Sequence, residues 1–96
     1  MDTQFYIVFN LKTAKGTESF ARFFIGNNEE QAYDVFAQMK GTESDETNIL
    51  YMDFMGTAEG VPVNLKMIVC TLDQLTENCR IITREVFKLF NLEETR

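Results

Sequence analysis

The fold of this chain is decided by residues 49–70, which read ILYMDFMGTAEGVPVNLKMIVC. The even positions of Leu50–Phe54 are apolar, as in a strand that buries one face. After a turn that contains two glycines, every odd position of Val61–Val69 is apolar and predicts a second strand with these side chains toward the core. Pro62 cannot donate a ladder hydrogen bond, so the start of the second strand is predicted at a sheet edge.

The first part of the chain repeats this pattern. Residues 4–12 are rich in β-branched and aromatic side chains, and residues 18–25 continue the signal after a turn near Gly16. These two segments predict a second hairpin. The face of residues 18–25 is ambiguous, because both of its faces carry two large apolar side chains.

Each hairpin is followed by a helix signal. Asn27-Asn28 supplies a capping amide and Glu29-Glu30 places negative charge in a first turn, which predicts a helix that stops at Gly41. Thr71 and Gln74 have capping-box spacing, which predicts a second helix ending near Asn91. The apolar stripes of the two helices are Ala32, Val35, Phe36 and Met39, and then Leu75, Cys79, Ile82, Val86 and Leu89.

These elements predict an α+β fold in the order ββαββα. Two helices with one apolar stripe each can cover one face of a four-stranded, mainly antiparallel sheet and form a two-layer structure. The 96 residues are enough for one domain, 1–96, in which residues 93–96 are expected to be a frayed tail. Strand order cannot be obtained from this pattern.

The composition removes several kinds of chemistry. The chain has no histidine, so Ser-His-Asp and Cys-His catalysis and the common zinc sites are excluded within one copy. The five glycines do not form a phosphate loop, and the acidic stretch 43–46 lacks the spaced ligands of a calcium loop. Cys70 and Cys79 are too far apart for a redox motif and are interpreted as packing residues. We therefore expect no cofactor, no metal and no catalytic residue.

Charge and hydropathy limit the partners. The net charge of −6 repels phosphate backbones and anionic lipids, so we expect neither nucleic acid nor membrane as a partner. Aromatic strands can stack on single-stranded RNA, but the element order and the acidity argue against that use here. The first residues do not form a signal peptide, and no apolar run is long enough to span a membrane. Two cysteines suit a reducing compartment, so a cytoplasmic location is expected.

One face of the predicted sheet is left without a covering layer. Alternation sends Tyr6, Val8, Phe20 or Phe23, Ile49, Tyr51, Met55 and Ile68 to that face, which is unusually apolar for a surface in contact with water. The favoured interpretation is a non-enzymatic module that assembles as a homodimer or higher oligomer through this face. The alternative is a small-molecule-binding domain, or a weakly specified enzyme, whose site would use Tyr6, Arg22, Tyr51, Asp53 and Lys66.

Two further residues bear on these alternatives. Asp53 interrupts an apolar strand and is the one candidate for a general base, although an ordinary cross-strand pair with Arg22 is the preferred interpretation. Ile81 and Phe87 fall on opposite sides of the stripe of the last helix, so contact with the sheet cannot bury both. Both observations leave an assembly function ahead of an enzymatic one.

Overall fold

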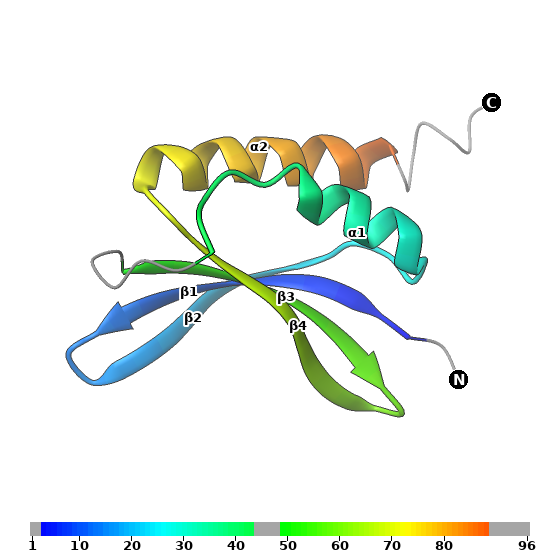
Figure 1. Ribbon diagram of the computed structural model, residues 1–96, viewed down its shortest axis with the longest axis horizontal. Coiled ribbons are helices and arrows are strands. Elements are labelled where there is room, and N and C mark those ends of the chain that lie inside the picture. The colour runs from blue at the N-terminus through cyan, green and yellow to red at the C-terminus, as the bar shows by residue number, and fades with distance from the viewer. Residues whose placement is uncertain (1–2, 44–48, 89–96) are drawn as a thin grey trace.

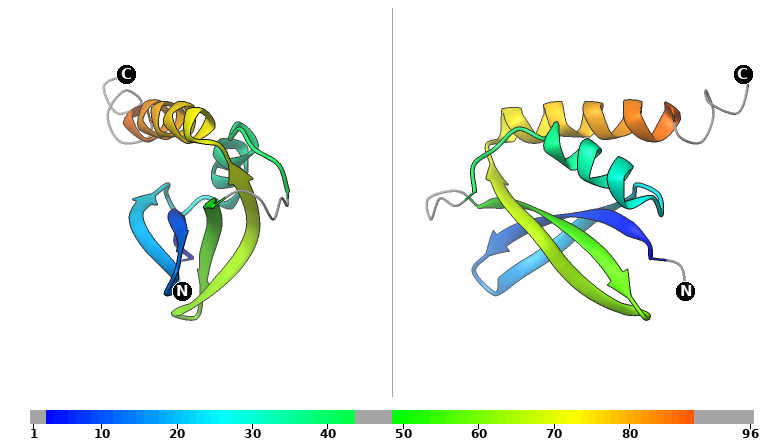
Figure 2. Two further views of the ribbon diagram at one scale, coloured as in Figure 1. Left: turned by 90° about the vertical axis from the view of Figure 1, so that its left-hand side faces the viewer. Right: turned by 45° about the vertical axis from the view of Figure 1, so that its right-hand side comes forward.

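The computed structural model describes residues 3–43 and 49–88. Its sheet has four antiparallel strands in the order β2-β1-β3-β4. Both helices lie on one face of this sheet (Figures 1 and 2), which confirms the predicted two-layer α+β fold. In chain order the elements are β1 (Phe5–Thr13), β2 (Gly16–Phe24), α1 (Glu29–Ala37), β3 (Leu50–Ala58), β4 (Val61–Cys70) and α2 (Leu72–Phe87).

The element boundaries differ from the predicted ones at the second turn and at α1. Strand β3 continues to Ala58 because the turn itself needs only Glu59 and Gly60, which both have positive φ. Helix α1 ends at Ala37 instead of continuing to Gly41. The predicted helix end near Asn91 and the frayed tail, like most of the polar loop before β3, lie outside the described residues.

Both helix starts follow the capping signals. The Asn28 side chain accepts a hydrogen bond from the Gln31 backbone N–H at 2.9 Å. Thr71 accepts from the Gln74 backbone N–H at 3.1 Å, and the Gln74 side chain accepts from the Thr71 backbone N–H at 2.8 Å. These bonds satisfy amides that a helix start leaves free, so they fix where each helix begins.

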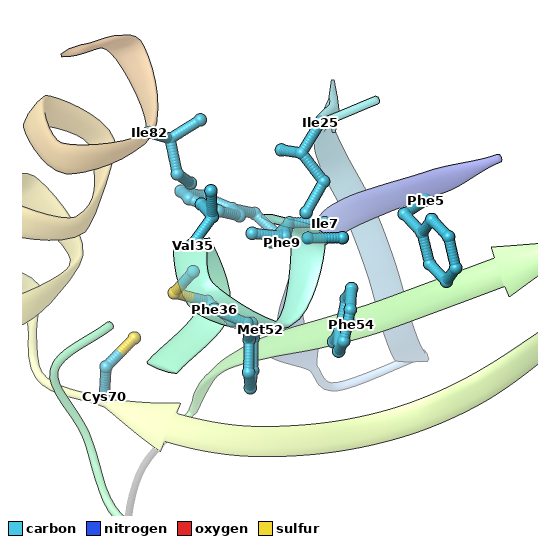
Figure 3. Close-up of a cluster of buried hydrophobic side chains, with 11 residues drawn as sticks. Phe5, Ile7, Phe9, Ile25, Val35, Phe36, Met52, Phe54, Cys70 and Ile82 are labelled. Atoms are coloured by element: carbon cyan, nitrogen blue, oxygen red, sulfur yellow. The ribbon is translucent and has the colours of Figure 1, made fainter. Parts of the chain in front are cut away.

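The core lies between the sheet and the two helices (Figure 3). Phe54 on β3 is at its centre, with no exposed surface. Its ring stacks on Phe36 of α1 at a centroid distance of 5.0 Å and meets the edge of Tyr33 at 4.8 Å. Ile82 of α2 closes the same cluster. The predicted stripes of the two helices therefore face the sheet, apart from Leu89, which lies outside the described residues.

A buried asparagine joins the two halves of the helical layer. Asn78 of α2 has no exposed surface. Its side chain accepts from the Lys40 backbone N–H at 2.7 Å and donates to the Lys40 carbonyl at 2.9 Å. Its amide also approaches the Met52 sulfur at 3.0 Å. The segment after α1 is thereby attached to α2, a contact that the sequence pattern does not predict.

Each hairpin contains one β-bulge. Phe20 is the extra residue of β2, opposite the step from Phe9 to Asn10, and Leu65 is the extra residue of β4, opposite the step from Phe54 to Met55. A bulge adds one residue to one strand only, so it shifts the alternation of that strand relative to its partner.

This shift makes the predicted face of β4 wrong in its second half. Before the bulge at Leu65, Val61 and Val63 are on the helix side of the sheet, as predicted. After it, Met67 pairs with Asp53, and both lie on the face away from the helices, while Ile68 turns to the core. The assignment of Ile68 to the uncovered face is therefore also wrong.

The ambiguity of β2 is resolved by its neighbours. Phe20 and Phe23 both contact the Phe9 ring, at centroid distances of 5.9 and 5.3 Å, so neither lies on the uncovered face. Arg22 and Phe24 lie there instead, because they pair with Val8 and Tyr6 of β1. Ile49 precedes β3 and takes no position in the strand.

The two β-hairpins are related by a local two-fold axis. They align so that Tyr6 corresponds to Tyr51 and Val8 to Asp53, and this alignment also matches the two bulges. Val8 and Asp53 are paired directly across the antiparallel β1–β3 ladder. The axis therefore passes between these two residues, normal to the sheet.

The two edge strands of the sheet, β4 and β2, differ in whether another described segment pairs with them. Thr42, in the segment that follows α1, pairs with Val69 at the free edge of β4, away from β3. The Val69 N–H donates to the Thr42 carbonyl at 2.8 Å, and the Thr42 N–H donates to the Val69 carbonyl at 2.9 Å. The bridge requires glycine at the preceding position, because a Cβ on Gly41 would lie 2.5 Å from the Val69 carbonyl oxygen. Within residues 3–43 and 49–88, no strand pairs with the outer side of β2.

Candidate functional site

The face of the sheet away from the helices, hereafter the outer face, is covered by none of the described segments (Figure 2). The turn ends of both hairpins bend away from the helices and border this face (Figure 1). Three rows cross it from β2 to β4: Phe24, Tyr6, Met55 and Asn64; Arg22, Val8, Asp53 and Met67; and Ser19, Asn10, Tyr51 and Val69. Seven of these twelve side chains are apolar or aromatic. The polar ones are Asn10 and Asp53 on the central strands and Ser19, Arg22 and Asn64 on the edge strands.

A line of hydrogen bonds crosses the middle of the outer face. Ser19 donates to the Asn10 side-chain oxygen at 2.5 Å, and the Asn10 amide donates to Oδ2 of Asp53 at 2.6 Å. The other carboxylate oxygen of Asp53, Oδ1, is buried and has no hydrogen-bond partner among the described residues. A buried acceptor without a donor is costly, so this oxygen is an unfavourable group beneath the centre of the face, where a donor from outside the chain does not reach it in this conformation.

The guanidinium group of Arg22 lies over a neighbouring aromatic ring. Its guanidinium carbon is 4.8 Å from the centre of the Tyr6 ring, and the side chain is solvent-exposed. The two residues border a hollow of about 470 Å³, whose other lining residues are Gln4, Phe24, Thr57 and Pro62. Arg22 makes no ion pair with any described residue, so the expected Arg22–Asp53 pair is not present.

The structure brings four of the five predicted site residues onto the outer face: Tyr6, Arg22, Tyr51 and Asp53. Lys66 lies on the opposite side of the sheet, where its ammonium group is 5.8 Å from the centre of the Tyr33 ring of α1. The bulge before it is the cause. The cation beside Tyr51 is instead Lys12, at 5.9 Å from the ring centre.

Sequence reasoning missed Asn10, Ser19 and Phe24 as members of the site. The sequence did carry a signal for Asn10, which is a polar residue in an otherwise apolar strand. In the structure its side chain is 5% exposed. Ser19 and Phe24 could not be placed without the β2 bulge.

Most of the acidic residues that the structure describes lie away from the outer face. Of the charged strand side chains described, Lys12, Arg22 and Asp53 are on this face. The helices carry Glu29, Glu30, Asp34, Asp73, Glu77 and Glu85. Arg80 pairs with Glu77, and Arg84 and Lys88 pair with Glu85, so these basic residues of α2 are matched by carboxylates of the same helix. Among the described strand residues, the outer face therefore carries two cations and one carboxylate.

The thiols do not form a second site. Both cysteines are free, and burial raises the pKa of Cys70, with Cys79 nearby adding to the effect. Burial also raises the pKa of Cys79. A thiol with a raised pKa is a poor nucleophile at neutral pH, which agrees with a packing role.

The part of the chain that the structure describes offers neither a cluster of metal ligands nor a membrane-spanning helix. Residues 3–43 and 49–88 contain no cluster of three or more acidic or cysteine side chains that could hold a metal ion. Within the same ranges, neither helix is long and apolar enough to cross a bilayer.

Comparison of the chain with protein families, curated proteins and solved structures gives no match. The class of protein is therefore defined by the fold alone, a two-layer ββαββα domain with an open sheet face, and its function has to be argued from that face.

Proposed function

We propose that this protein is a non-enzymatic assembly module that forms a homodimer through the outer face. The observation that carries the proposal is the apolar character of a sheet face that none of the described segments covers. Phe24 and Met67 are 43% and 41% exposed there, on the two edge strands. A face that stays in water is normally polar, whereas one that packs on a second sheet is apolar.

A second copy is the partner that suits this face. Two sheets of the same twist pack face to face with their strands nearly aligned. The face has a cation on the edge strand β2, Arg22, and a carboxylate on the central strand β3, Asp53, so it can be complementary to itself. The helical carboxylates point to the other side of the molecule and do not oppose the approach. The two free thiols support a cytoplasmic location for the module.

Two phenylalanines of β2 provide a matched test. Phe24→Asp places a charge on the outer face, whereas Phe20→Asp places one on the helix side of the same strand, at similar exposure (43% and 51%). We expect the wild type and Phe20→Asp to be dimers in light scattering at micromolar concentration, and Phe24→Asp to be a monomer. Circular dichroism checks that each variant is folded. Equal masses for the two variants would contradict the proposal.

A second candidate function rests on the hollow beside Arg22. Its volume of about 470 Å³, the guanidinium on the Tyr6 ring and the apolar side chains of Phe24 and Pro62 suit a small aromatic carboxylate. In a thermal-shift screen of aromatic carboxylates, this function predicts stabilisation of the wild type that Arg22→Gln abolishes. If no compound raises the melting temperature, or if Arg22→Gln responds as the wild type does, the hollow is not such a site.

A further inference from the structure

We infer that the dimer is held in one register by a reciprocal charge pair, in which Arg22 of each copy binds Asp53 of the other. This inference rests on the proposed homodimer and specifies how its two outer faces meet. It uses two properties of these residues: neither Arg22 nor Asp53 makes an ion pair with any described residue, and on the outer face Arg22 is exposed and Asp53 is half-buried.

The register of the sheet sets the geometry. Arg22, Val8 and Asp53 lie in one row on adjacent strands β2, β1 and β3. Neighbouring strands are about 4.8 Å apart, so Arg22 and Asp53 flank Val8 at equal distances. A two-fold axis that runs along β1 beneath Val8 exchanges the two flanking positions. It therefore places Arg22 of one copy opposite Asp53 of the second copy, and forms the same pair twice.

The same axis brings apolar groups together in the next row. There, Phe24 and Met55 flank Tyr6 in the way that Arg22 and Asp53 flank Val8. Phe24 of one copy thus faces Met55 of the second copy, a favourable contact between an aromatic ring and a thioether. Packed sheets are about 10 Å apart, which an arginine and an aspartate side chain span together.

The charges also select against the other obvious arrangement. The local two-fold axis of the domain passes between Val8 and Asp53, so a dimer centred there would set Asp53 of one copy against Val8 of the second copy. It would leave both carboxylates and both guanidinium groups unpaired in the interface, which is unfavourable. Asp53 of the second hairpin occupies the position that Val8 occupies in the first. This difference breaks the two-fold symmetry of the outer face and selects one register for the dimer.

Exchange of the charges tests the inference. In Arg22→Asp, two carboxylates meet at each pair, and in Asp53→Arg, two guanidinium groups meet. We expect each variant alone to dimerise roughly 100-fold more weakly than the wild type, or worse, because like charges in an interface repel. In an equimolar mixture every pair is again a carboxylate with a guanidinium group. The mixture should therefore form a heterodimer, seen by native mass spectrometry.

A conservative pair of variants covers the case in which Asp53→Arg does not fold. For Arg22→Gln, Asp53→Asn and the double variant, dimer dissociation constants form a double-mutant cycle. We expect the double variant to dimerise no more weakly than either single variant.

Additive losses in the cycle, or no heterodimer from folded charge-exchanged variants, would overturn the charge pair while the wild-type dimer stands. A wild type that is monomeric at every concentration would refute the dimer itself. A dimer insensitive to all four single substitutions would indicate pairing through the open edge of β2.

Discussion

Phe54→Ala is expected to lower the free energy of unfolding by about 3–5 kcal/mol, the usual cost of removing a phenylalanine from a core. Phe54 is fully buried and contacts the rings of Phe36, Tyr33 and Phe5, so no neighbour is free to fill the space. Urea unfolding followed by circular dichroism measures the loss. A small domain has a total stability of about 5–15 kcal/mol, so this loss removes a large fraction of it.

Phe87→Ala is the control for this experiment, since Phe87 is 51% exposed at the end of α2. Its loss should be below about 1 kcal/mol. Similar losses for the two variants would mean that the Phe54 cluster is not the centre of the core.

Asn78→Ala is expected to cost about 2–4 kcal/mol. The substitution removes both bonds to the Lys40 backbone and the contact with Met52, and leaves buried polar groups without partners. The same urea titration measures it. Asn64→Ala, on the exposed part of β4, is the control and should change stability by less than about 0.5 kcal/mol.

Asn78→Asp separates hydrogen bonding from simple packing. Burial should raise the pKa of the new carboxyl above its unfolded value of about 4, because the charged form is desolvated. The folded state then binds the proton more tightly than the unfolded state, so stability is retained below about pH 4 and lost as the pH rises above it. A variant whose deficit relative to wild type is independent of pH would show that position 78 is not buried as described.

The order of elements and the helix starts could be predicted because local signals determine them. Alternation identified both hairpins, and the side chains of Asn28, Thr71 and Gln74 marked the two caps at which the helices begin. The two-layer arrangement followed from one apolar stripe per helix. All of these features depend on residues that are close in sequence.

The face of each edge strand could not be predicted, because a β-bulge reverses it without a local signal. The odd positions of β4 are apolar throughout, yet the bulge at Leu65 sends Met67 to the outer face and Lys66 away from it. This is why Lys66 is not part of the candidate site. Asn78 was overlooked for a different reason: it lies on the buried stripe between Leu75 and Cys79, and a polar residue there is the one signal that could have revealed its role.

The candidate site was predictable in part. Tyr6, Tyr51 and Asp53 lie on the two central strands, β1 and β3, whose alternation is regular, and the sequence placed them on the correct face. Arg22 also lies there, but the sequence did not establish its face. The hydrogen bonds from Ser19 through Asn10 to Asp53 depend on strand order, which is a tertiary property.

The claim that two copies meet through their outer faces is tested most directly by isotope-filtered NMR on a sample of mixed labelled and unlabelled chains. The account predicts nuclear Overhauser contacts between the Met55 methyl group of one copy and the Phe24 ring of the other. It also predicts a particle of twice the chain mass of 11.1 kDa. A particle of single mass, or contacts between copies that come only from α2 or from the open edge of β2, would contradict it.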